Sequence, residues 1–169
     1  MPRFTALPCM TLLALLAAGC TSLSNVPPGT PLQTAINEYG TPTQRCSNTQ
    51  PQLVNWSMQP MGYYAWTAEV DQQEVIVSIQ QMLSDEGFKR LDQQSWEAPM
   101  IACWYGPPAV EEIALWKGKP YHTWSYRYKQ GGAFNSLMYL YFNDEGQLVH
   151  HHPGPDPRDI NDGIFRGMD

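Results

Sequence analysis

The residues best suited to covalent chemistry lie near the start of the chain, in the stretch LLALLAAGCTS around Cys20. A single positive charge, Arg3, precedes an apolar run over residues 6–18. That run is shorter than the ~20 residues that a membrane-spanning helix needs. A positive start, a short apolar middle and small residues before a cleavage site are typical of a secretory signal peptide. We therefore expect residues 1–19 to be removed.

The cysteine that follows this segment indicates what happens next. Small residues lead directly into Cys20, as in a bacterial lipobox, in which the cysteine is acylated and the chain is cut before it. We predict cleavage between Gly19 and Cys20, and anchoring in membrane lipid through acylated Cys20. The alternative is an ordinary signal peptide with an incidental cysteine. Because Thr21 is not an aspartate, we predict the periplasmic face of the outer membrane as the location.

Three consecutive histidines, His150 to His152, are the most tempting metal ligands. Side chains alternate along a strand, so only His150 and His152 can share a face. A zinc site would also need Asp156 or His122, because zinc takes three or four converging ligands. We interpret the cluster instead as the solvated end of a strand and predict no bound metal.

Motifs for catalysis are missing from the sequence. It contains neither the Gly-x-Ser-x-Gly elbow of serine hydrolases nor the His-Glu-x-x-His pair of zinc peptidases. Glu111 and Glu112 are adjacent on a predicted strand, so their carboxylates would point to opposite faces. We expect a protein that is not an enzyme and that has no cofactor.

Composition narrows the partners. The 169 residues carry a formal net charge of −6 and no basic run, which argues against nucleic acid as a partner. Charged residues make up only 15% of the chain, while aromatic residues are plentiful. With Cys20 acylated, Cys46 and Cys103 remain, an even number in an oxidising compartment. They could form a disulfide, or they could be two separate buried thiols.

The expected elements fall into two similar halves. A polar tether over 20–29 leads to a helix over 30–39, strands over 52–58, 61–71 and 74–79, and a helical piece over 82–91 that Gly87 should break. The second half repeats the order, with a helix over 95–106 and strands over 109–116, 121–129, 136–143 and 147–152.

The two halves share short motifs. Tyr-Gly-x-Pro begins at Tyr39 and again at Tyr105, an offset of 66 residues. Trp56 and Trp124 both precede a serine, an offset of 68. We predict an α+β fold of two tandem units, each a helix with an antiparallel sheet, over 30–91 and 92–157, with a flexible tail over 158–169.

Aromatic residues alternate along several of these strands, and most should be buried. One sheet face that the helices leave open could still bind a protein partner, because Tyr and Trp are enriched in interfaces. The candidate partner face consists of Tyr63, Tyr64, Trp66, Trp124 and Tyr126.

Several stretches together resemble the SmpA/OmlA/BamE-like outer-membrane lipoproteins, and more narrowly a two-unit branch from beta-proteobacteria. The stretches are YGTPTQR, YGPPAVEE, TWSYRY, YFNDEGQLV, QPMGYYAWTAEVD and GPDPRD. The resemblance covers roughly residues 29–159 and implies two helices against a three-stranded sheet in each unit. Paired units of this kind also resemble beta-lactamase-inhibitor proteins.

The resemblance also implies cysteines near Asn135 or Ser136 and near Asp159, which this chain lacks. For function, it implies a non-enzymatic scaffold or accessory in envelope or outer-membrane protein assembly, acting through protein partners. The alternative is a periplasmic inhibitor or ligand-binding lipoprotein, for which the turn at Met61–Tyr63 would be the protruding element. Fold alone does not decide between them.

Overall fold

The structure is a computed structural model that describes residues 22–161. The first half forms a four-stranded antiparallel sheet in the order β1-β2-β3-β4, and the second half forms another in the order β5-β6-β7-β8. The first-half elements are η1 (Leu23–Asn25), α1 (Leu32–Tyr39), β1 (Gln44–Cys46), β2 (Gln52–Ser57), β3 (Ala65–Val70), β4 (Ile76–Gln81), α2 (Asp85–Phe88) and η2 (Lys89–Asp92). Those of the second half are α3 (Ala98–Tyr105), β5 (Val110–Trp116), β6 (Lys119–Gln130), β7 (Phe134–Phe142), β8 (Leu148–Pro155) and α4 (Pro157–Asn161).

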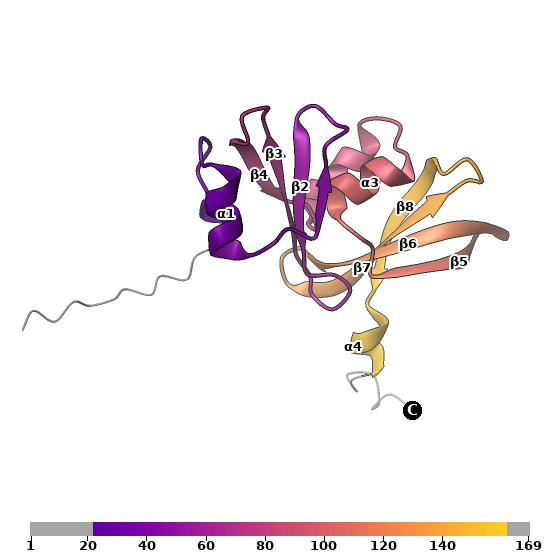
Figure 1. The fold of residues 1–169 in the computed structure, drawn as a ribbon. Helices are drawn as coiled ribbons and strands as arrows, with labels where there is room; N and C mark the ends of the chain where they lie inside the picture. Colours follow the sequence, from indigo (N-terminus) through magenta and orange to yellow (C-terminus); the bar gives the residue numbers. More distant parts are fainter. Residues whose placement is uncertain (1–21, 162–169) are drawn as a thin grey trace, which may run out of the picture.

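The predicted α+β fold of two tandem helix-plus-sheet units is confirmed. Each sheet has four strands rather than the three that the family resemblance implies, because β1 and β5 add an outer strand to each. The layers follow one another as α1, the first sheet, α3 and the second sheet, so α3 lies between the two sheets (Figure 1).

The two main helices begin and end by the same local chemistry. Pro31 precedes the first residue of α1, and Pro99 lies in the first turn of α3, where its missing N–H costs no helical hydrogen bond. Each helix ends at a glycine with positive φ, 87° at Gly40 and 77° at Gly106. Glycine adopts this conformation without the steric cost of a Cβ, so the chain turns sharply into the following sheet after each helix.

Three hydrophobic clusters hold the layers together. The first lies between α1 and the first sheet and includes Leu32, Ala35, Val54 and Trp56. The largest lies between the α2–α3 region and the second sheet. It contains Phe88, Leu91, Trp96, Ile101, Tyr105, Tyr126, Tyr128, Met138, Leu140 and Phe142. A small third cluster joins the two units around Cys46, Leu53 and Cys103.

The repeat is real, but its register differs from the sequence alignment. Trp56 donates from Nε1 to the carbonyl of Gly40 (2.8 Å), and Tyr126 donates from its hydroxyl to the carbonyl of Gly106 (2.9 Å). Tyr126, not Trp124, is therefore the counterpart of Trp56. The offset is 66 residues at the glycines and 70 in the second strand. The alignment of Trp56-Ser57 with Trp124-Ser125 was therefore two residues out of register. Such a shift keeps each side chain on the correct face of the strand but places it at the wrong position along the strand.

The predicted unit boundaries need three corrections. The expected tether is folded from Ser22 onward, because Val26 is buried and Gly29 donates to the carbonyl of Ile76. Residues 82–91, assigned to the first unit, contribute Phe88 and Leu91 to the core of the second. The expected flexible tail is anchored at its start, where Arg158 binds the carbonyl of Met61 (3.1 Å). The predicted signal peptide and Cys20 lie outside the described residues.

Gly87 does not break the helical piece as predicted but lies within α2. A Cβ at this position would lie 2.1 Å from the carbonyl oxygen of Met82. Glycine therefore permits the close approach of α2 to the chain leaving β4. Tyr105 reinforces the contact by donating its hydroxyl to the Gly87 carbonyl at 2.8 Å.

Cys46 and Cys103 form a disulfide, which joins β1 of the first unit to α3 of the second. Of the two alternatives left open by the sequence, the pairing is the correct one. At the positions where the resemblance implies cysteines, Asn135 donates from Nδ2 to Oδ1 of Asp159 at 2.9 Å. A polar contact thus links these two positions in this chain.

Candidate binding surfaces

The five residues of the predicted partner face do not form one surface. Tyr126 is fully buried and belongs to the core, so its assignment was wrong. Trp124 packs edge-on against Phe142, with ring centroids 5.0 Å apart, on the helix-covered side of the second sheet. Trp66 is half-buried on the first sheet beside Trp56. Alternation identified aromatic strands, but it could not show which side the helices cover.

Tyr63 and Tyr64 lie in the loop between β2 and β3. Tyr64 is 43% exposed, whereas the ring of Tyr63 lies beneath two cations. Lys129 Nζ is 4.7 Å and Arg158 Cζ 5.2 Å from its centroid, distances typical of cation–π contacts. The loop is therefore attached to the second unit at Tyr63 and does not present this ring as a free anchor.

A different set of rings gathers on the opposite side of the second sheet. The register places alternate residues of β5 to β8 on this side. We call it the aromatic face, defined by Trp116, Tyr121, Tyr139, Tyr141, His150 and His152. None of these side chains belongs to the hydrophobic clusters of the described residues, since α2 and α3 cover the other side.

The rings of this face contact one another in a row. Trp116 and His150 are stacked, with centroids 4.1 Å apart and planes 14° apart. His150 is 5.4 Å from His152, whose Nε2 is 3.1 Å from the hydroxyl of Tyr141. Tyr139 lies 5.5 Å beyond His152. The rings thus hold one another in place. Most of them are half-buried, so part of each remains available for stacking against a partner.

The electrostatics of the face favour the neutral forms of three of its rings, those of His150, Tyr139 and Tyr141. Burial lowers the pKa of His150, and the neighbouring His152, His151 and Lys117 lower it further. Burial raises the pKa of Tyr139 and of Tyr141, and the exposed carboxylate of Glu112 acts in the same direction. Rings with few charged side chains between them resemble the cores of protein interfaces.

A cluster of charges closes one end of the face. Asp156 is fully buried and pairs with Arg127 (2.5 Å) and Arg158 (2.9 Å). Arg127 also donates from Nε to the carbonyl of Pro60, and its backbone N–H donates to Oε1 of Gln59. Gln59 Nε2 in turn donates to the Arg127 carbonyl at 3.0 Å. One glutamine amide thus continues the ladder of β6 beyond the start of β5.

The three consecutive histidines lie on both sides of β8. His150 and His152 share the aromatic face, while His151 points away and bonds Asp92 (3.0 Å), as alternation predicted. His122 pairs with Ile113 on the other side of the sheet, and Asp156 is occupied by arginines. Within residues 22–161, no three His, Cys, Asp or Glu side chains gather in a group that could hold a metal.

The predicted partner face, which included Trp124 and Tyr126, contains none of the residues of the aromatic face. A signal was available in the residues beside Trp124 and Tyr126. Thr123, Ser125 and Arg127 alternate with the core aromatics of β6, so their side was the one less suited to a helix. The residues that pair with them, including Tyr139 and Tyr141, must share that side.

In comparisons with known proteins, no protein-family model, no curated protein and no solved structure matches the chain. A search of the described residues for a helix long and apolar enough to cross a membrane finds none.

Proposed function

We propose that this chain is a non-enzymatic lipoprotein that binds a protein partner in cell-envelope or outer-membrane protein assembly. Acylated Cys20 would hold it at the periplasmic face of the outer membrane. The observation that carries the proposal is the aromatic face, a row of rings that no helix of the described chain covers. Interfaces concentrate their binding energy in such rings, with charged residues at the rim.

The position of the charges supports a protein partner for this face. Lys117, whose ammonium lies 4.5 Å from the Trp116 ring, and exposed Glu112 lie beside the rings rather than among them. The buried Asp156 cluster fixes the far end of the same sheet face. The loop that the inhibitor alternative requires is attached to the second unit at Tyr63, which argues against a freely protruding inhibitory loop.

The test is site-specific crosslinking in intact cells. A photo-crosslinking phenylalanine analogue at Trp116 should capture a partner, because the ring lies on the aromatic face. The matched control is the same analogue at Ile113, which is 60% exposed on the same strand but points to the other side. Equal capture from both positions, or none from Trp116, would contradict the proposed face. Barrel-assembly components among the captured proteins support the assembly role, and a soluble hydrolase supports inhibition instead.

The anchor is tested separately. Cys20→Ser should release the protein from the outer-membrane fraction, because acylation would be lost. Normal retention in that fraction would overturn the anchoring proposal and leave the aromatic face untouched.

A further inference from the structure

The open edge of the first sheet offers a second binding site, separate from the aromatic face. β4 is an edge strand, and the chain before α1 forms backbone hydrogen bonds only with its beginning, while η1 packs against the side of β4 that carries Ile79. Gly29 donates to the carbonyl of Ile76, and Ile76 donates to the carbonyl of Thr30, both through the backbone. Beyond Ile76, from residue 77 to residue 81, no strand of the described chain lies along this edge.

The register of β4 shows which backbone groups face outward. Met82 donates to the carbonyl of Ala65 at 2.8 Å, so these two residues form a hydrogen-bonded pair. In an antiparallel ladder such pairs alternate with pairs whose N–H and C=O point away from the partner strand. Ile79 and Gln81, opposite Ala68 and Trp66, belong to the second kind.

Few of these outward groups have a partner in the part of the chain that the structure describes. Ser84 donates its hydroxyl to the Gln81 carbonyl at 3.2 Å. The N–H of Gln81 and both backbone groups of Ile79 form no hydrogen bond within residues 22–161. A row of this kind is a template for one more strand.

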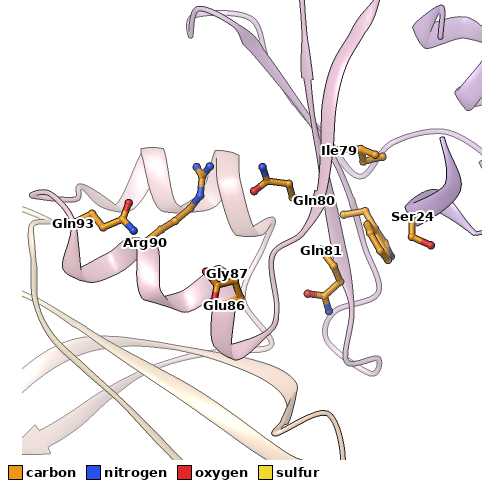
Figure 2. A pocket seen from close by; sticks show the side chains of 9 residues that line it. Ser24, Ile79, Gln80, Gln81, Glu86, Gly87, Arg90 and Gln93 are labelled. Carbon is orange, nitrogen blue, oxygen red and sulfur yellow. The ribbon is translucent and has the colours of Figure 1, made fainter. Parts of the chain in front are cut away.

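A groove of about 650 Å³ runs along this edge. One wall carries Ser24, Trp66 and Ile79, and the other carries Glu86, Gly87, Arg90 and Gln93. Figure 2 shows Ile79 and Gln80 pointing to opposite sides of β4, with Gln80 directed toward the helical wall. The side chains that border the edge are therefore largely apolar on the side of Ile79 and polar or charged on the side of the helical wall.

The helical wall carries a positive charge that the fold does not neutralise. The guanidinium of Arg90 lies 4.2 Å from the centroid of the Trp104 ring, which fixes its position. Glu86, the acidic residue of the same wall, pairs with Lys89 at 2.7 Å. Arg90 forms no ion pair within residues 22–161. This wall favours an acidic side chain, while Ile79 and Trp66 favour apolar ones.

We propose that the β4 edge binds an extended peptide segment of a partner protein, which adds a fifth strand to the first sheet. Its backbone would pair with Ile79 and Gln81, and its side chains would alternate between apolar residues toward Ile79 and acidic residues toward Arg90. Pairing two copies of this chain along β4 would bring two unneutralised Arg90 side chains to one junction, so charge favours a partner over a second copy.

Amide hydrogen exchange of the full chain tests the proposal with a synthetic probe. The probe is an eight-residue peptide of alternating valine and glutamate, and the control peptide alternates valine and lysine. The Ile79 and Gln81 amides should exchange fast in the free protein, and the acidic peptide alone should slow them by at least about tenfold. Slow exchange without peptide would overturn the proposal. If that slow exchange depends on protein concentration, a second copy of the chain covers the edge. If it does not, a segment of the same chain covers it.

Two substitutions at one position separate the backbone from the side chain. Gln81→Pro removes the outward N–H without touching the ladder to β3, and edge strands tolerate proline in that orientation. It should weaken acidic-peptide binding by up to about tenfold, the value of one hydrogen bond. Gln81→Ala keeps the N–H and should bind within about twofold of the unaltered chain. Equal binding by both variants would contradict strand addition. Arg90→Gln should abolish the preference for the acidic over the basic peptide.

Discussion

Helices α1 and α3 occupy equivalent places in the two repeats, yet their compositions differ. In α1, exposed Gln33, Asn37 and Glu38 share the helix with buried Leu32 and Ala35, as on a helix with one covered face. The sequence of α3, APMIACWY, contains no charged or amide side chain. None of its residues from Ile101 to Tyr105 is exposed. A helix segment that is apolar on all sides is one that is covered on all sides, and only the start of α3, where Met100 is 37% exposed, departs from this.

The surroundings of α3 explain this composition. Ile101 and Tyr105 face the second sheet, Cys103 faces the first, and Trp104 packs against the clusters on both sides. The last carbonyls of a helix lack partners within the helix. The carbonyl of Trp104 accepts from Thr67 Oγ1 at 2.5 Å and from Asn55 Nδ2 at 3.4 Å. The first sheet is therefore covered on both faces, by α1 and by α3, whereas no helix of residues 22–161 covers the aromatic face of the second sheet.

The largest effect should come from separating α3 from the first sheet at the disulfide. Cys46 and Cys103 are 57 residues apart, and closing a loop of that length stabilises by about 4 kcal/mol through loss of unfolded-state entropy. Cys46→Ala with Cys103→Ala should lower the free energy of unfolding by about this amount. Denaturant titration measures the loss, and reduction of the unaltered protein should reproduce it. An unchanged midpoint would mean that the two units associate as firmly without the bond.

The charge cluster that ties the second sheet to the first unit should rank next. Asp156→Asn keeps the shape but leaves Arg127 and Arg158 without their carboxylate, which should cost about 3 kcal/mol. Burial alone would raise the pKa of Asp156, but hydrogen bonds from Arg158 and Arg127 outweigh it and lower this pKa.

The pH dependence distinguishes this cluster from simple packing. Because the folded pKa of Asp156 lies below the unfolded one, its stabilisation is complete above about pH 4 and is lost as pH falls through the folded pKa. Denaturant titrations of the unaltered protein should therefore show an acid-sensitive component that Asp156→Asn lacks. The same acid sensitivity in both proteins would contradict the assigned role.

The aligned glycines give the most direct comparison of the repeats. Gly40→Ala meets nothing within 4 Å, whereas a Cβ at Gly106 would lie 2.5 Å from Asn55 Oδ1 in the first sheet. Both substitutions should cost about 1–3 kcal/mol for backbone strain at positive φ. Gly106→Ala should cost at least about 1 kcal/mol more, because overpacking displaces the middle layer. Thermal or denaturant unfolding of the two variants measures the difference, and equal losses would contradict the layered arrangement.

These comparisons also show what the sequence could reveal. The Tyr-Gly-x-Pro motifs predicted the repeat, the helix ends and the two-unit fold, because glycine and proline act locally. Strand β1 was missed because three residues carry too little periodicity. Tyr126 was misplaced because alternation divides a strand into two sides without showing which one a distant helix covers. That information lay in α3, whose apolar sequence indicated burial between two sheets.

The smallest effect on stability should come from His150, on the aromatic face of the second sheet. His150 should titrate below its ordinary midpoint of about 6.5, because burial, His152, His151 and Lys117 all disfavour its charged form. As its folded pKa lies below the unfolded one, the unfolded chain binds more protons between these two values. Stability should therefore fall slightly as pH falls from about 6.5 toward the folded pKa. Proton NMR of the imidazole measures the midpoint.

Three variants show whether the aromatic face causes this shift. Lys117→Gln and His152→Gln each remove a neighbour that lowers the pKa of His150 and should raise its midpoint, while Trp116→Ala should raise it by exposing the ring that Trp116 now stacks upon. A midpoint at or above 6.5 in the unaltered protein would mean that the rings are more open to water than their packing indicates. A midpoint that moves with Trp116 would show that the free face of the second sheet is preassembled in solution, which distinguishes it from the first sheet, where α3 occupies the equivalent surface.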